Sequence, residues 1–344
     1  MLDKSDRHKI RRMIHDTIVI GAGLAGLTAA GRLQKAGQNV LVLEKSRGLG
    51  GRAATRRWDG FPVDHGAQFF TARSEEFRAQ VERWLQAGVC HRWADGFHQH
   101  RNSRLEPPQE DGHPRFACRQ GMSSLGRALA EAESVAIVRQ TKVVSIQAAQ
   151  DGWLLADENG RTFHSRRLIV TAPPPQGAQL LREAAPRAAE LLQTFRADPC
   201  LAVAAKYPRR ALAWTGIQSD SAEISWIGHD TSKRPAEHPG QTVVVVHASA
   251  DFSRTHYDEA EEEITRRLLS HASAIAGQDL GHHAGTFLQR WRYATVEEAS
   301  SAEPAAAVEA PAPLILAGES FAGGKIEGAW LSGRHAADLS LSYG

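Results

Sequence analysis

The stretch TIVIGAGLAG at residues 17–26 decides the fold of this chain. Its first four residues are β-branched and apolar, a composition typical of a buried parallel strand. Gly21, Gly23 and Gly26 follow at once with GxGxxG spacing, and residues 27–37 then have the apolar spacing of a helix. The sequence therefore predicts a strand, a tight turn and a helix whose N-terminus faces a phosphate group.

A second predicted strand, NVLVLEKS at residues 39–46, follows this helix and carries Glu44 near its end. An acid at this place accepts hydrogen bonds from a ribose diol. Gly21 permits the tight turn, Gly23 lets a pyrophosphate approach the backbone, and Gly26 lets helix and strand pack closely. The βαβ unit thus predicts dinucleotide binding, and by itself leaves NAD and FAD both open.

The next stretch, RGLGGRAATRR at residues 47–57, favours FAD. A second glycine pair directly follows the second strand, and Arg52 and other arginines flank it. Bare backbone beside guanidinium groups suits the pyrophosphate of a long ligand that runs past the turn. A solvated basic loop is the alternative interpretation.

A third glycine-rich stretch, GESFAGGKIEGAWLSG at residues 318–333, lies at the other end of the chain. It follows the apolar segment LILAG and leads into a predicted helix over 329–340, but it lacks the spacing of a second dinucleotide fingerprint. One long ligand held at both ends explains both stretches. We therefore predict FAD, with its adenosine at the first turn and its flavin near the positive end of the last helix.

The composition is that of an ordinary globular protein with 344 residues, 42% hydrophobic and 23% charged. A net charge of +2 gives no case for nucleic-acid or membrane binding, and no apolar run approaches the ~20 residues of a membrane span. The three cysteines form no CxxC, so we expect no metal site and a reducing, cytoplasmic location. Met13 is a second possible start, and residues 1–12 are predicted to be a flexible basic tail; the oligomeric state stays open.

The predicted fold class is α/β: an FAD-binding Rossmann-like domain of the amine-oxidase and p-hydroxybenzoate-hydroxylase type, with an inserted mixed-sheet α+β substrate domain. An amphipathic helix is predicted over 75–88, a short hairpin with loops over 90–118, and a long acidic helix near 256–275. AEPAAAVEAPAP reads as a connector between the domains. The expected division is 13–74, 119–175 and 311–344 for the FAD-binding domain, and 75–118 and 176–310 for the substrate domain.

Five segments together resemble the flavin amine-oxidase superfamily, and more narrowly its renalase-like family in the bacterial branch. They are GAGLAGLTAA with Glu44, GLGGRAATRR, DHGAQFFTAR, TAPPPQ and GESFAGGKIEGAWLSG. The resemblance covers the chain from about residue 14 to its end. It implies noncovalent FAD and oxidation of 2- or 6-dihydro isomers of NAD(P) to NAD(P)⁺, with dioxygen reoxidising the flavin to hydrogen peroxide.

The resemblance also implies which residues contact FAD. The expected set is Gly21, Gly23, Ala25, Gly26, Glu44, Lys45, Gly51, Arg52, Gln68, Val143, Gly318, Glu319, Glu327, Gly328 and Ala329. The candidate substrate pocket is Trp226, His247, Arg290, Trp291 and Tyr293.

Two positions depart from the renalase-like pattern: Phe69 replaces a tyrosine, and Asp230 stands where an amide is more familiar. An acid at 230 could repel an anionic substrate or bind an amine. No general base is evident, and hydride loss from a dihydropyridine needs none. The alternatives are oxidation of an amine or desaturation of another small molecule, and a flavin-binding protein without turnover.

Overall fold

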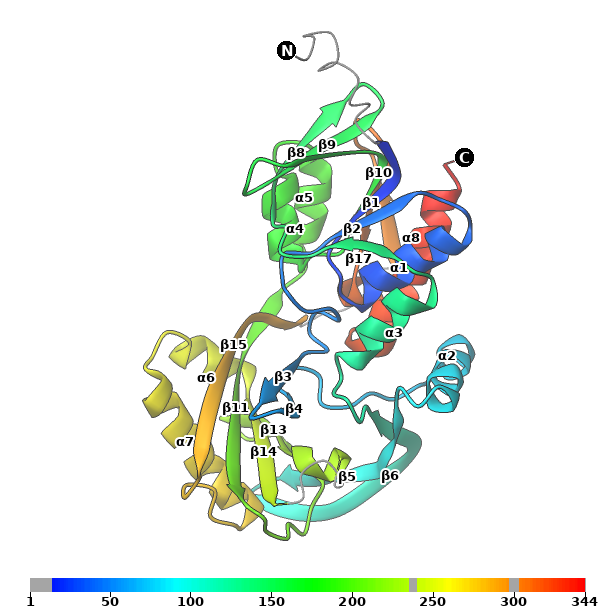
Figure 1. Ribbon diagram of the computed structural model, residues 1–344. Coiled ribbons are helices and arrows are strands. Elements are labelled where there is room, and N and C mark those ends of the chain that lie inside the picture. The colour runs from blue at the N-terminus through cyan, green and yellow to red at the C-terminus, as the bar shows by residue number, and fades with distance from the viewer. Residues whose placement is uncertain (1–13, 235–239, 297–302, 344) are drawn as a thin grey trace, which may run out of the picture.

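The computed structural model describes residues 14–234, 240–296 and 303–343, so the predicted basic tail lies outside the described residues. These residues form two lobes, each built on one large β-sheet (Figure 1). The first sheet has eight strands, and its central strands are parallel. In spatial order its main path is β16 (Ala305–Val308), β17 (Leu314–Ala317), β10 (Thr162–Val170), β1 (Ile14–Ile20), β2 (Val40–Leu43) and β7 (Ala136–Val138), with β8 (Val143–Ala149) and β9 (Gly152–Asp157) attached to β10.

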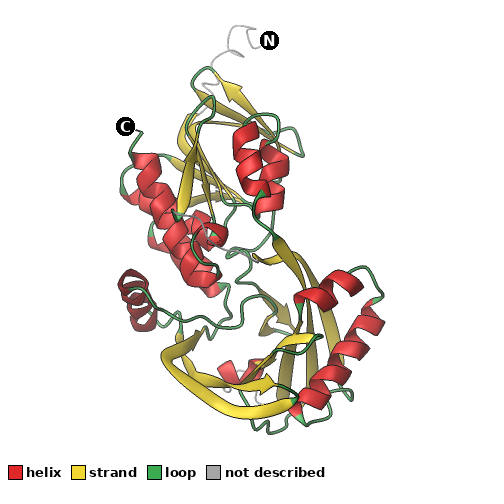
Figure 2. Cartoon of the chain, turned by 180° about the vertical axis from the view of Figure 1, so that it is seen from behind, coloured by secondary structure: helices red, strands yellow, loops and turns green. Residues whose placement is uncertain are grey.

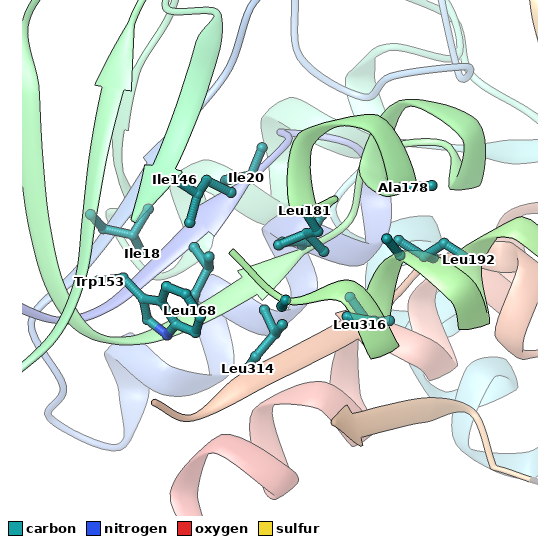
Figure 3. Packing of buried hydrophobic residues seen from close by; sticks show 14 of the residues in the cluster. Ile18, Ile20, Ile146, Trp153, Leu168, Ala178, Leu181, Leu192, Leu314 and Leu316 are labelled. Atoms are coloured by element: carbon teal, nitrogen blue, oxygen red, sulfur yellow. The ribbon is translucent and has the colours of Figure 1, made fainter. Parts of the chain in front are cut away.

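Helices cover both faces of this sheet, because its strands are apolar on both sides. On β1, Ile18 and Ile20 belong to the core under one set of helices and Val19 to the core under the other. Figure 3 shows Leu181 and Leu192 on the first of these faces, beside the strand residues. One face carries α4 (Pro174–Leu181) and α5 (Pro186–Gln193); the other carries α1 (Leu24–Lys35), α3 (Ser124–Ala132) and α8 (Lys325–Leu341).

Helices α4 and α5 differ from the expected domain division, which ends the first domain at residue 175. Their buried residues pack against strands of the first sheet, because the apolar side chains of Leu181 and Leu192 cover apolar residues of β10 and β17. The expected connector differs as well, since its residues 305–308 form the edge strand β16 of the same sheet.

The second sheet has seven strands and is mixed, with mostly antiparallel pairing. Two helices cover its outer face, and Figure 2 shows them beside the strands of the lower lobe. The predicted long acidic helix near 256–275 corresponds to the second of them, which begins at Glu261 with three glutamates in its first turn; the first is a separate short helix that ends at His256. The strands in order are β15 (Gly285–Val296), β11 (Ala197–Pro208), β14 (Gln241–Ala248), β13 (Ile224–His229), β12 (Gly216–Ser219), β5 (His91–Arg101) and β6 (Arg104–Ala117), and the helices are α6 (Ala250–His256) and α7 (Glu261–Ala276).

The inner face of the second sheet is partly covered by the hairpin of β3 (Thr55–Trp58) and β4 (Phe61–Asp64), whose Val63 packs on it. The amphipathic prediction is confirmed for α2 (Glu75–Gln86), whose buried residues include Phe77. Phe77 contacts Trp330 of α8, so α2 packs on the first lobe. The predicted short hairpin over 90–118 is instead the long curved pair β5 and β6.

Candidate active site

A single large cavity runs from the glycine turn after β1 to the inner face of the second sheet. Its volume is 2880 Å³. Small-molecule sites commonly have about 300–1,000 Å³, so this cavity has room for a dinucleotide cofactor and a substrate together. Residues from both lobes and from all three glycine-rich stretches line it.

The glycine turn is shaped by close backbone contacts. Gly21 has φ +105°, a conformation that favours glycine. A Cβ on Gly26 would lie 2.0 Å from the carbonyl oxygen of Gly21, and a Cβ on Gly51 would lie 3.1 Å from Cα of Gly23. The first two glycine-rich stretches therefore touch each other. Gly21, Gly23 and Gly51 line the cavity, whereas Gly26 is used for packing and does not.

Helix α1 begins after Gly23 without a side-chain cap, so its first N–H groups are left for a ligand in the cavity. Glu44 lies beside this turn and is 8% exposed. Its carboxylate accepts from the backbone N–H of Ala22 and of Ser46, both at 2.7 Å. These bonds hold the acid in place and leave further lone pairs for a ribose diol.

Three other expected cofactor residues of the first lobe also line the cavity: Ala25, Lys45 and Val143. Lys45 donates from Nζ to Oε1 of Gln176 at 2.8 Å, which ties the second strand to helix α4. Val143 begins β8, on the side of the cavity formed by the first sheet.

An ion pair joins the second glycine-rich stretch to the third. Arg52 binds the carboxylate of Glu319 through both terminal nitrogens, and its side chain is 28% exposed against 13% for the acid. Glu319 begins the short helix η3 (Glu319–Phe321), directly after Gly318 at the end of β17. Both charged groups line the cavity, so this pair connects the two ends of the proposed cofactor site.

The last glycine-rich stretch also lets two helices approach. A Cβ on Gly333 of α8 would lie 2.2 Å from the carbonyl oxygen of Ala25 on α1. Gly328 and Ala329 line the cavity near the start of α8. Glu327 lines it too, but its carboxylate accepts from the N–H of Arg73 and Ser74 before α2, at 2.9 and 2.7 Å. Glu327 therefore anchors α2.

Strand register places the substrate-side candidates on the second sheet. Trp226 of β13 is opposite His247 of β14, which is opposite Ala202 of β11, which is opposite Gln289 of β15. Directly paired residues share a face, so these four side chains form a row on the inner face. Alternation along β15 then puts Trp291 and Tyr293 on the same face as Gln289, and all three line the cavity.

Arg290 points the other way, because neighbouring residues of a strand alternate between faces. Its guanidinium donates to the carbonyl oxygens of Tyr257 and Glu259, at 2.9 and 2.7 Å, in the connection between α6 and α7. It borders the cavity, yet its donors are used on the helical side of the sheet.

Trp226 is 6% exposed and is not part of the cavity wall. Its ring packs at 5.3 Å from Phe69 and at 4.8 Å from Phe97. Phe69 does line the cavity, so Trp226 supports an aromatic wall from behind. The replacement of tyrosine by phenylalanine at 69 leaves this wall without a hydroxyl group.

Gln68 is likewise buried behind the cavity, at 5% exposure, and does not line it. Its Oε1 accepts from Nζ of Lys233 at 3.1 Å, and its Nε2 lies 3.5 Å from Nε2 of His247. The expected contact with FAD is therefore replaced by a link between a buried lysine and a cavity histidine.

Next to Gln68, four charged side chains form a fully buried cluster: Asp64, Asp230, Lys233 and Arg234. The last three lie in or beside the short helix η2 (Asp230–Lys233). Asp230 pairs with Lys233 at 2.9 Å and with Arg234 at 2.7 Å. The prediction that Asp230 could meet a substrate is wrong, because both of its oxygens are bound inside the protein.

The structure adds His65, which the sequence analysis missed. Its ring stacks on Trp291 with centroids 5.4 Å apart and planes at 16°, and it lines the cavity. Burial lowers the pKa of His65 to about 4, and burial, with Lys233 and His65 nearby, lowers the pKa of His247 to about 3. The cavity thus holds two imidazoles that are neutral at pH 7. The motif DHGAQFF was the available signal for His65.

Among the described residues, no group of His, Cys, Asp and Glu is arranged to hold a metal ion. The described helices are all too short or too polar to cross a membrane. What the site does offer is a glycine cradle, an uncapped helix start and a long cavity. These features fit a dinucleotide that extends to the second sheet, as an FAD-dependent oxidoreductase requires.

Comparison with known proteins agrees with this class. Residues 19–84 match the model of the NAD(P)-binding Rossmann-like domain, and residues 91–340 match that of the flavin containing amine oxidoreductases. The chain belongs to the flavin-containing amine oxidoreductase family. The family is one of flavin-containing oxidoreductases, and the predicted fold class is confirmed.

Curated relatives match over short stretches. Polyamine oxidase 3 of Oryza sativa subsp. japonica is 44% identical over 69 residues, or 20% of this chain and 14% of the relative. The carotenoid 3,4-desaturase of Haloarcula japonica is 46% identical over 55 residues, 16% of this chain and 11% of the relative. The chain thus spans a small part of the length of the relatives it matches, and these act on unlike substrates by name.

Two solved structures share the whole fold. Putrescine oxidase bound to putrescine superposes with a TM-score of 0.74 at 14% identity, covering 96% of this chain and 99% of the other. Cyclohexylamine oxidase from Brevibacterium oxydans gives a TM-score of 0.74 at 14% identity, covering 96% and 100%. At this identity the likeness concerns the fold.

Proposed function

We propose that the protein oxidises 2- or 6-dihydro isomers of NAD(P) to NAD(P)⁺, as its resemblance to renalase-like proteins implies. FAD, held by the glycine cradle and the pair of Arg52 with Glu319, would supply the hydride acceptor, and dioxygen would take up the two electrons with protons to give hydrogen peroxide. The protein's own task is to hold the dihydropyridine ring flat against the flavin and to exclude water.

The charge of the cavity wall carries this proposal, because it suits an anionic dinucleotide better than a protonated amine. Among the described residues that line the cavity, the carboxylates of Glu44, Asp111, Glu319 and Glu327 have partners within the protein. A fifth carboxylate of the lining, Glu183, lies just after α4 on the first lobe, away from the second sheet. Asp230 is removed from the site by its buried ion pairs. Little negative charge is left beside the second sheet to hold an ammonium group.

Positive charge is available there instead. Arg56 lines the cavity, and its guanidinium carbon lies 4.6 Å from the ring centroid of Phe287. No ion pair of Arg56 is found in the described part of the chain. A guanidinium group without an ion-pair partner is suited to bind a phosphate group of the substrate.

The neutral wall suits the reacting ring. Trp291, Tyr293 and Phe69 supply flat apolar surfaces, and the imidazoles of His65 and His247 add polar groups without charge. Hydride loss creates a pyridinium cation, for which aromatic faces are favourable neighbours. The same faces could receive an alkylammonium group, which keeps an amine oxidase as the second candidate.

The test is an anaerobic reaction of the purified yellow protein with 2-dihydro- and 6-dihydro-NAD(P). β-NADH and putrescine serve as comparison substrates. Rapid bleaching of the flavin by an isomer alone, with NAD(P)⁺ as product, is the expected result. Bleaching by putrescine alone would assign the protein to the amine oxidases, and no bleaching by any of them would overturn the proposal.

Arg56→Gln and Arg57→Gln form a matched pair for the charge argument. Arg57 also lines the cavity, but its guanidinium already donates to Oε1 of Gln120 at 3.0 Å. Arg56→Gln is expected to raise the Kd of the isomer about tenfold, the effect of one charge-assisted hydrogen bond. Arg57→Gln should change it much less, and equal effects would remove Arg56 from the phosphate site.

We further propose that FAD is bound noncovalently, through the glycine cradle, Glu44 and the pair of Arg52 with Glu319. Denaturing the protein in acid and removing the precipitate tests this directly. Flavin released to the supernatant is the expected result, whereas flavin retained on the polypeptide would contradict it.

A further inference from the structure

We propose that Lys233 and Gln68 act as positioning residues that hold His247 as a neutral hydrogen-bond donor, with its proton on Nδ1 and directed to a carbonyl oxygen of the substrate. Within the proposed function, on which this last step rests, the acceptor is the carboxamide oxygen of a dihydronicotinamide. Of the three residues, only His247 has been used above, as an uncharged polar group of the cavity wall.

The argument begins at Lys233, whose side chain is fully buried. Its ammonium group has three hydrogens and three acceptors: Oδ1 of Asp230 at 2.9 Å, Oε1 of Gln68 at 3.1 Å and Oδ2 of Asp64 at 3.3 Å. The two carboxylates fix the ammonium group, and Arg234 compensates their second charge. Lys233 is therefore a rigid, fully used donor.

Lys233 decides which way the amide of Gln68 points. An ammonium group can only donate, so the amide must turn its oxygen to Lys233 and its nitrogen away. Gln68 Nε2 then donates to the carbonyl oxygens of Asp64 and Gly66, at 2.5 and 3.1 Å. The flipped amide would place N–H groups against Lys233 and an oxygen against two carbonyls, which costs several hydrogen bonds in a buried site.

The orientation of Gln68 in turn decides the tautomer of His247. Nε2 of His247 lies 3.5 Å from Nε2 of Gln68, which is a donor. The amide nitrogen has two hydrogens for three neighbours, so one of them is shared between a carbonyl oxygen and His247 Nε2. An amide nitrogen cannot accept a hydrogen bond, so His247 Nε2 presents its lone pair to this shared hydrogen. The ring is neutral, and its single proton is therefore on Nδ1.

The proton on Nδ1 is available to a ligand. The ring of His247 lines the cavity, and its Nδ1 has no hydrogen-bond partner among the described residues. His247 of β14 shares the inner face of the sheet with Gln289 of β15, the strand that also carries Trp291, and β11 lies between these two strands. A neutral N–H donor at this place suits a carbonyl or carboxamide oxygen and does not suit an ammonium group, which has no lone pair.

The tautomer can be observed without any turnover. We would label histidines with ¹⁵N in the flavin-loaded protein and assign His247 by comparison with His247→Leu. A protonated Nδ1 and an unprotonated Nε2 at pH 7 are expected. A proton on Nε2, or an equal mixture of tautomers, would overturn the proposal whatever the substrate proves to be.

Two variants at Gln68 test the positioning step. Gln68→Glu keeps the shape but places an acceptor beside His247, so the proton should move to Nε2. Gln68→Met removes both functions, so a mixture is expected. Gln176→Glu adds the same carboxylate elsewhere on the cavity wall and should leave the His247 spectrum unchanged. An unchanged His247 spectrum in both Gln68 variants would show that Gln68 does not set the tautomer.

Binding of NAD⁺, the product of the proposed reaction, completes the test. Gln68→Glu is expected to raise the Kd of NAD⁺ for the oxidised enzyme about tenfold relative to Gln176→Glu. If the natural sequence carries the His247 proton on Nδ1 but the two variants bind NAD⁺ equally well, the contact with the substrate is overturned and the tautomer assignment stands. Absence of NAD⁺ binding by every variant, including the natural sequence, would count against the proposed function and leave the tautomer result standing.

Discussion

His65 and Trp291 stack face to face in the cavity wall, although the segments that carry them are far apart in the sequence. Their ring centroids are 5.4 Å apart with planes at 16°, and the indole Nε1 of Trp291 donates to the carbonyl oxygen of His65 at 2.9 Å. The same tryptophan thus supplies one wall of the site and fixes the loop that supplies the other.

Replacing Trp291 by phenylalanine is expected to destabilise the protein by about 1 kcal/mol, because the carbonyl oxygen of His65 loses its donor. Urea unfolding at pH 7 measures this change. Trp214→Phe is the matched control, since the indole N–H of Trp214 is buried without a partner in the described part of the chain. It should cost less, and equal losses would mean that the hydrogen bond to His65 contributes nothing specific.

Removing the charge of Arg52 should weaken FAD binding. Arg52→Met leaves the partly buried carboxylate of Glu319 without its partner in the proposed cofactor site, and a tenfold or larger rise in the Kd of FAD is expected. Flavin content after dialysis and titration of the apoprotein with FAD measure it. Arg187→Met breaks the exposed pair with Glu309 and should change neither quantity. Normal flavin content in Arg52→Met would contradict the assigned role.

Asp230→Asn should be strongly destabilising, by about 3 kcal/mol or more, because it leaves two buried cations with one carboxylate. Equilibrium unfolding in urea, with flavin present, gives the difference. Asp59→Asn is the control. Asp59 pairs with Lys206 but is itself largely exposed, so the loss of this ion pair should have little effect on stability. If Asp230→Asn unfolds at the same urea concentration as the natural sequence, the cluster tolerates an uncompensated charge.

Acid should destabilise the protein well above the range in which carboxylates titrate. His65 has an ordinary pKa of 6.5 when unfolded and a pKa of about 4 when folded, since burial disfavours its charged form. Between these values the unfolded chain binds a proton that the folded protein does not, so stability falls as pH falls from about 6.5 to 4. One such group contributes at most about 3 kcal/mol over this window.

His65→Phe keeps the ring stack and removes this titration, so its loss of stability between pH 7 and pH 4.5 should be smaller. His247 titrates in the same direction and is unchanged in the variant, so part of the loss remains. His282→Asn is the control, because the exposed His282 beside Asp279 has a raised pKa and cannot reduce the loss in acid. Identical pH profiles for His65→Phe and the natural sequence would refute the assignment.

The sequence by itself determined the βαβ unit of the first lobe and the kind of cofactor, whereas α4, α5 and β16 were recognised as parts of this lobe only in the structure. The steric demands that GxGxxG, the second glycine pair and the C-terminal glycines reflect are local, so these motifs can be read without a structure. Gly21 needs its positive φ, and Gly51 needs the space beside Gly23. The alternation of side chains between the two faces of β1 is equally local, since neighbouring apolar residues point to opposite buried faces.

Only the tertiary structure decided what surrounds the substrate. Trp291 is separated from His65, and Lys233 from Gln68, by well over a hundred residues, and no local pattern predicts which of many polar and aromatic residues contact each other. Asp230 and Gln68 were expected at the ligand and are buried behind the cavity wall, where Lys233 forms an ion pair with Asp230 and donates a hydrogen bond to Gln68. The periodicity of apolar residues in the sequence predicts which side chains are buried. The substrate site depends on which of these buried side chains contact each other, and that is decided by the tertiary structure.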